Sequence, residues 1–211
     1  MIRVVTRYVH AVRNILPIII LGLFSTQAAP AEVSLRTVDW QTNTDGHLVT
    51  VRLTETIGWG DLERVRAAMK LAKGKHKLVV ALEMDSEGGD GDTGIILADY
   101  VAKNNIDVLL EGSCWSACSF AAMVALGRGN LFIRPGAELG VHTVYDTATG
   151  VPDKQWTKRA AAILSKLGAP HPPLKAMVDT PADDLTLFDY SDLERMGGIV
   201  LQGEWSWWMW E

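Results

Sequence analysis

The chain has 211 residues, of which 48% are hydrophobic, so it is long enough for one domain with a buried core. Its 25 acidic residues outnumber 20 basic ones and give a formal net charge of −5 at pH 7. We expect no nucleic-acid partner, because phosphate binding needs a basic surface.

The N-terminus has the pattern of a secretory signal peptide. Three arginines precede the apolar run 15–24, and Ala29-Pro30-Ala31 offers an Ala-x-Ala cleavage site. The run is shorter than the roughly 20 residues that span a bilayer, which favours cleavage over a signal anchor. We therefore expect a periplasmic or secreted protein that starts at Glu32, with 17 basic residues against 25 acidic ones.

The next segments alternate between strand and helix. Residues 47–53 alternate as in a strand, and residues 61–73 have helical spacing with acids first and bases last. A strand is predicted from residue 78, a helix over 95–101 and a further strand over 107–110. This alternation predicts an α/β fold with a mostly parallel sheet and right-handed crossovers.

A glycine pair follows the strand that starts at residue 78, within Met84-Asp85-Ser86-Glu87-Gly88-Gly89-Asp90. Such a pair leaves backbone N–H groups uncovered, as an oxyanion hole requires, although most glycine pairs are only turns. Four carboxylates surround it: Asp85, Glu87, Asp90 and Asp92. They either point into solvent or oppose an anionic intermediate. Their spacing is not that of a calcium loop, so we expect no metal there.

A serine lies between two cysteines in Gly112-Ser113-Cys114-Trp115-Ser116-Ala117-Cys118, and the small-residue stretch 120–126 follows. The pattern predicts strand, tight turn and helix, with Ser116 at the turn. There a serine presents its hydroxyl at the mouth of a site, and the helix N–H groups face any negative charge that develops. A helix N-cap is the commoner role of such a serine, so both interpretations stay open.

The two cysteines, Cys114 and Cys118, flank Ser116 and are the only cysteines of the chain. In an oxidising compartment they could form a disulfide that braces the turn, mainly through local geometry because the closed loop is short. Two buried thiols are the alternative. Zinc is not expected with two cysteines and no neighbouring histidine.

A histidine ends the short strand predicted for Leu139-Gly140-Val141-His142-Thr143. A lone histidine is usually structural or solvated. Here, however, the glycine pair, Ser116 and His142 together supply the donors, the nucleophile and the base of acyl transfer.

In these motifs the chain resembles the Clp protease proteolytic subunit family and its periplasmic ClpP-like relatives, within the ClpP/crotonase superfamily. The family's Ser-Pro-Gly-Gly loop corresponds to residues 86–89, its Gly-x-x-x-Ser turn to residues 112–116, and its base to His142. The similarity covers roughly residues 78–144, with a looser match at 192–199. It implies a ClpP/crotonase-like fold of stacked ββα units.

The resemblance implies that Ser116 is the nucleophile and His142 the general base. It implies an oxyanion hole made by the N–H groups of Gly88 or Gly89 and of Ala117.

The third triad member has no clear match. Asp184 in Thr180-Pro181-Ala182-Asp183-Asp184 ranks first, with a one-residue shift, and a solvated turn aspartate is the alternative. A serine–lysine dyad would instead use one of three lysines, Lys154, Lys158 or Lys166.

The C-terminal part departs further from the family. The helix predicted over 154–167 occupies the place of the ring-forming handle but is short and is followed by three prolines, so we do not expect rings and leave a homo-oligomer open. The tail 203–211 holds four of eight tryptophans. It is expected to pack on the domain; a membrane contact or a plug in the protein's own groove are the alternatives.

The sequence thus predicts a signal peptide over 1–31, a ClpP/crotonase-like domain over 32–202 and a Trp-rich tail over 203–211. The expected function is an exported serine hydrolase that acts on peptides or proteins without a cofactor. Export separates it from ATP, so no ATP-dependent unfoldase partner is expected, and from coenzyme A, which disfavours thioester chemistry. The alternative is a binding or assembly module of the cell envelope that has lost catalysis.

Overall fold

The computed structural model describes residues 32–38, 48–75, 80–146 and 148–201. The predicted leader 1–31 and the Trp-rich tail 203–211 lie outside the described residues. Within the described ranges, no helix has the length and apolar character needed to cross a membrane.

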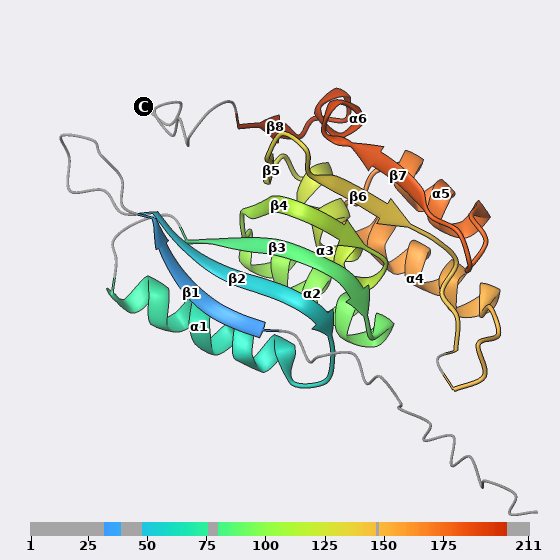
Figure 1. The fold of residues 1–211 in the computed structure, drawn as a ribbon, viewed down its shortest axis with the longest axis horizontal. Coiled ribbons are helices and arrows are strands. Elements are labelled where there is room, and N and C mark those ends of the chain that lie inside the picture. Colours follow the sequence, from blue (N-terminus) through green and yellow to red (C-terminus); the bar gives the residue numbers. More distant parts are fainter. Residues whose placement is uncertain (1–31, 39–47, 76–79, 147, 202–211) are drawn as a thin grey trace, which may run out of the picture.

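One mixed, mostly parallel sheet forms the centre of the domain (Figure 1). Its strands are β1 (Glu32–Val38), β2 (Leu48–Ile57), β3 (Val80–Gly89), β4 (Val108–Trp115), β5 (Leu131–Ile133), β6 (Glu138–Val141), β7 (Thr186–Asp189) and β8 (Ile199–Val200). The main order is β1-β2-β3-β4-β5-β8, and only the β1–β2 and β6–β7 pairs are antiparallel. The α/β fold with a mostly parallel sheet is confirmed.

Strand β4 has two partners on one side. Its first half pairs with β5, where Leu110 lies opposite Ile133, and its second half pairs with β6, where Trp115 lies opposite Gly140. This division brings β6 beside the end of β4, so the residues that follow these two strands come close together.

Six helices connect the described strands. They are α1 (Asp61–Lys75), α2 (Gly91–Asn104), α3 (Ala117–Gly127), α4 (Lys154–Leu167), α5 (His171–Asp179) and α6 (Tyr190–Arg195). Asp90 and Asp153 cap α2 and α4 by accepting the N–H groups of Thr93 and Trp156. Prolines in the first turn of α5 are tolerated, because the N–H groups there have no intrahelical partner.

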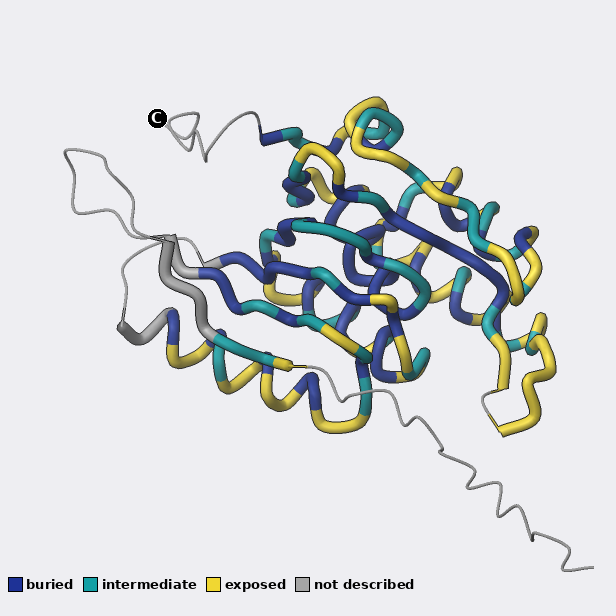
Figure 2. The backbone as a smooth tube through the Cα atoms, in the orientation of Figure 1, coloured by how far each residue is buried: buried dark blue, intermediate teal, exposed yellow. Residues whose placement is uncertain are grey.

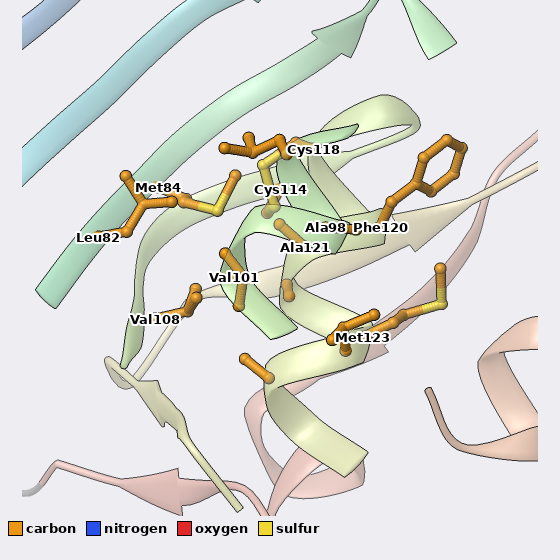
Figure 3. Packing of buried hydrophobic residues seen from close by; sticks show 14 of the residues in the cluster. Leu82, Met84, Ala98, Val101, Val108, Cys114, Cys118, Phe120, Ala121 and Met123 are labelled. Atoms are coloured by element: carbon orange, nitrogen blue, oxygen red, sulfur yellow. A yellow bond between two sulfur atoms is a disulfide. The ribbon is translucent and has the colours of Figure 1, made fainter. Parts of the chain in front are cut away.

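Helix α3 forms the centre of the hydrophobic core. Every residue from 117 to 126 is buried, as expected for a helix that is apolar on all sides (Figure 2). Figure 3 shows Cys118 of α3 beside Met84 and Cys114 from the strands, and Phe120 of the same helix pointing away from them. Burying a large apolar side chain contributes about 1.5–3 kcal/mol, so this packing holds α3 against the sheet.

Helix α4 packs on its own domain through Trp156. The indole Nε1 donates to Asp92 Oδ1 at 3.2 Å, and its ring centroid lies 6.3 Å from that of Phe120. A Cβ at Gly91 would lie 2.8 Å from the indole Cη2 atom. Helix α4 is therefore held against α2 and α3 by close contacts.

Two strands extend beyond the apolar runs that predicted them. Strand β3 continues to Gly89, where Thr56 pairs with Gly88, and β4 continues to Trp115. The polar and glycine residues of both motifs are thus part of the sheet and not of free loops, because ladder hydrogen bonds depend on the backbone and not on apolar side chains.

Candidate active site

Ser116 lies at the junction of β4 and α3 with an unusual backbone conformation. Its φ of 51° and ψ of −123° fall outside the regions that non-glycine residues normally occupy. Its N–H donates to the Gly140 carbonyl at 2.9 Å, and its own carbonyl accepts from the N–H and hydroxyl of Ser119. Such a conformation costs about 1–3 kcal/mol and persists where the surrounding structure imposes it.

The geometry of Ser116 does not fit an ordinary N-cap. A capping serine has an extended backbone and accepts a helix N–H with its hydroxyl, whereas Ser116 has positive φ and makes no such side-chain bond. A strained serine on a sharp strand-to-helix turn is instead the geometry of a nucleophile elbow.

Ser116 and His142 line one pocket of about 430 Å³. The other lining residues come from the end of β3, from β4, and from segments after β6 and α5: Glu87, Trp115, Tyr145, Ala182, Asp183, Asp184 and Leu185. The pocket lies where parallel strands β3, β4 and β6 end, the usual position of ligand sites in α/β sheets.

His142 follows directly after β6 and is 8% exposed. Its Nδ1 atom lies 2.8 Å from the backbone carbonyl oxygen of Thr143. The Tyr145 ring stacks beside it, with ring centroids 6.1 Å apart. The loop after Tyr145 is fixed by Asp146, and hydrogen bonds to its carboxylate, first that from the Thr149 N–H, lower the pKa of Asp146.

The candidate acids lie at the rim of this pocket. Asp183 and Asp184 are exposed, and Asp184 Oδ1 accepts the N–H of Leu185 at 2.8 Å. The three candidate dyad lysines are exposed on α4, and the lining of the pocket within the described residues includes none of them: Lys154, Lys158 and Lys166.

Gly88 packs directly against the turn that carries Ser116. Its φ is 104°, and a Cβ added to it would lie 2.7 Å from both Ser116 Cβ and the Trp115 carbonyl oxygen. The same position is 3.0 Å from the N atom of Ala117, the first residue of α3. An N–H at the start of a helix has no intrahelical acceptor, so the Ala117 N–H is a candidate donor to an oxyanion.

The two glycines differ in their surroundings. The Gly88 N–H donates to Ser86 Oγ at 3.1 Å, and the Ser86 hydroxyl donates to the Glu55 carbonyl. Gly89 has a φ of 142°, faces the backbone of Ile57 on β2, and lines a neighbouring pocket. Gly88 is therefore the glycine of the pair that contacts Ser116.

The carboxylates around the glycine pair have separate roles. Asp85 lies 3.5 Å from Arg52, Asp90 caps α2, and Asp92 accepts the indole N–H of Trp156. Glu87 is exposed and lines the pocket of Ser116. Of these four side chains, Glu87 is the one that adds negative charge to the pocket.

Gly88→Ala is expected to lower the free energy of unfolding by at least about 1–3 kcal/mol, because alanine is strained at the positive φ of this position and its methyl group would clash with Ser116 and the Trp115 carbonyl. The same clash should slow any reaction at Ser116. Urea unfolding measures the stability. Gly136→Ala is the matched control, since Gly136 has a φ of 91° with open space around its Cβ position. Equal losses in the two variants would contradict the close packing of Gly88 on Ser116.

A disulfide joins Cys114 and Cys118 across the turn that carries Ser116 (Figure 3). The Cα atoms lie 5.2 Å apart, and both residues are fully buried. The bond ties the end of β4 to the first turn of α3, so it limits how far the Ser116 backbone can relax.

In exported protein, this disulfide should block alkylation of both cysteines. Denatured material treated with iodoacetamide without reductant is expected to keep its mass, whereas prior reduction should add two carbamidomethyl groups. Intact-mass spectrometry measures the difference. Two alkylated cysteines in unreduced exported material would show that Cys114 and Cys118 are packing residues with free thiols.

No protein-family model matches the chain, and no curated protein sequence matches it either. Its fold matches solved structures of ClpP. A single-residue variant of ClpP1 from Listeria monocytogenes has a TM-score of 0.55 and 16% identity, over 74% of this chain and 92% of that one. ClpP1 from the same bacterium gives a TM-score of 0.54 with the same identity and coverage. The chain has the ClpP/crotonase fold; at this identity the likeness concerns the fold alone.

Proposed function

We propose that this protein is an exported serine hydrolase that acts on peptide or protein substrates. The observation that carries the proposal is the strained conformation of Ser116, whose hydroxyl makes no capping bond and which shares a pocket with the buried His142. Conformational strain of this kind is concentrated at functional sites.

The proposed reaction begins with attack of Ser116 Oγ on the substrate carbonyl carbon. His142 accepts the serine proton and then donates it to the leaving amine, and water completes the cycle by hydrolysing the acyl-enzyme. The Ala117 N–H stabilises the oxyanion. The Gly88 N–H becomes the second donor to the oxyanion when the substrate oxygen replaces Ser86 Oγ as the acceptor of this N–H.

A binding or assembly module without catalysis is the second candidate function. One observation favours it: the Gly88 N–H, half of the expected oxyanion hole, already donates to Ser86 Oγ. A site in which this bond persists would hold a peptide without stabilising the tetrahedral intermediate.

A fluorophosphonate probe separates the two functions. On the hydrolase proposal, the purified protein is labelled, and peptide mapping places the adduct on Ser116. A folded, unlabelled protein that still binds peptides would establish the binding module instead. Neutral and basic peptides are the suitable substrates to test, because Glu87, Asp183 and Asp184 line the pocket and repel acidic side chains.

We also propose that residues 1–31 are a cleaved signal peptide and that the domain acts outside the cytoplasm. Expressed in full, the protein should be recovered from the periplasm or medium with Glu32 as its first residue. N-terminal sequencing of fractionated material measures this. A full-length product in the membrane fraction would indicate a signal anchor.

A further inference from the structure

The backbone carbonyl of Thr143 occupies the position beside His142 that a triad acid would fill. We infer that this carbonyl, and not a carboxylate, orients the base, so that Ser116 and His142 work as a dyad with Thr143 as the positioning residue. The kinetic consequence of the inference rests on the proposed hydrolase function; the hydrogen bond itself does not.

The hydrogen bond fixes the tautomer of the neutral ring. A carbonyl oxygen can only accept, so the Nδ1 atom of His142, 2.8 Å from it, must carry the proton. The lone pair then lies on Nε2, the nitrogen left to act toward Ser116 in the pocket. This is the tautomer that an aspartate enforces in a serine–histidine–aspartate triad.

The Thr143 carbonyl is held by its surroundings. The residue is 2% exposed, its N–H donates to the Thr180 carbonyl at 2.9 Å, and its hydroxyl donates to the Val178 carbonyl at 3.3 Å. On the other side of the carbonyl, the Val144 N–H donates to Thr157 Oγ1 at 3.1 Å. Bonds to α4 and to the end of α5 therefore fix the acceptor before substrate arrives.

The carboxylates that line the pocket are placed differently. Glu87, Asp183 and Asp184 are all exposed, and the Asp184 carboxylate accepts the N–H of the adjacent Leu185. Water screens exposed charges strongly. The Thr143 carbonyl, in contrast, is buried and already in contact with the ring.

Asparagine substitutions test the inference by kinetics. With a neutral peptide as substrate, Asp183→Asn, Asp184→Asn and the double variant should keep kcat within about threefold of the wild type, with any change in charge selectivity confined to KM, whereas loss of a triad acid lowers kcat by about 10⁴. A loss of a hundredfold or more in a variant with an unchanged circular dichroism spectrum would assign the third role to that aspartate and overturn the inference.

Nitrogen-15 NMR of the histidine rings provides a readout that needs no activity. In the neutral form, His142 of the full chain should show a protonated Nδ1 and an unprotonated Nε2, with the same shifts in Asp184→Asn. His142→Gln assigns the signals. A proton on Nε2 instead, or a tautomer that changes in Asp184→Asn, would overturn the inference even if the protein hydrolyses nothing.

A backbone substitution tests the carbonyl directly. Introducing the α-hydroxy analogue of valine at position 144 turns the 143–144 amide into an ester, whose carbonyl is a weaker acceptor, and also removes the Val144 N–H. Thr157→Val removes the acceptor of that N–H, together with the hydroxyl's own bond to the Asp153 carbonyl, and leaves the 143–144 amide intact, so it is the control. The ester should lower kcat about three- to tenfold more than the control, in line with the loss of one hydrogen bond. Equal kcat values in the two proteins would overturn the inference.

Discussion

Ser116→Ala is expected to abolish fluorophosphonate labelling and to lower kcat by a factor on the order of 10⁶, the loss seen when a serine nucleophile is removed. Loss of a single oxyanion donor costs only about 10²–10³. Stability should change little, because the Ser116 hydroxyl makes no capping bond. Probe labelling, peptide hydrolysis and urea unfolding measure the three effects.

Ser113→Ala is the matched control, since Ser113 lies on β4 shortly before Ser116 and lines a different pocket, which it shares with Arg52 and Asp85. It should label at the wild-type rate. Ser116→Gly should be as inactive as Ser116→Ala but more stable by about 1 kcal/mol, because glycine adopts positive φ without strain. Equal labelling of the wild type and Ser116→Ala would refute the nucleophile assignment.

The fold class could be predicted because its signals are local. Apolar runs and helical spacing are properties of short segments, and the helix predicted over 154–167 has the bounds of α4. The prediction missed α5, because the prolines after residue 169 indicated the end of a helix. Two of these prolines instead lie in the first turn of a new helix. It also missed β7, a short strand whose side chains alternate between half-buried and exposed.

The candidate site could be predicted only in part. The sequence predicted one site made of Ser116, His142 and the glycine pair, through the resemblance of these motifs to a known family, and it left open whether Gly88 or Gly89 takes part. It could not decide between an N-cap and a nucleophile at Ser116, since that choice depends on φ and on the hydroxyl's partner. The acceptor for His142 Nδ1 is a backbone oxygen, which every residue has and no motif marks.

His142→Ala is expected to reduce hydrolysis nearly as much as Ser116→Ala, because the serine hydroxyl is a weak nucleophile without a base. Initial rates of peptide hydrolysis by the wild type and by His142→Ala measure the loss.

The control for this substitution is His171→Ala, which removes an exposed histidine at the start of α5 and should leave the rate unchanged. Alanine variants of the three exposed α4 lysines, Lys154, Lys158 and Lys166, should also remain active, because none of these side chains lines the pocket of Ser116. A fully active His142→Ala together with one inactive lysine variant would replace the serine–histidine pair by a serine–lysine dyad. Since His142 is buried beside the Thr143 carbonyl and shares a pocket with Ser116, we expect the histidine variant to be the inactive one.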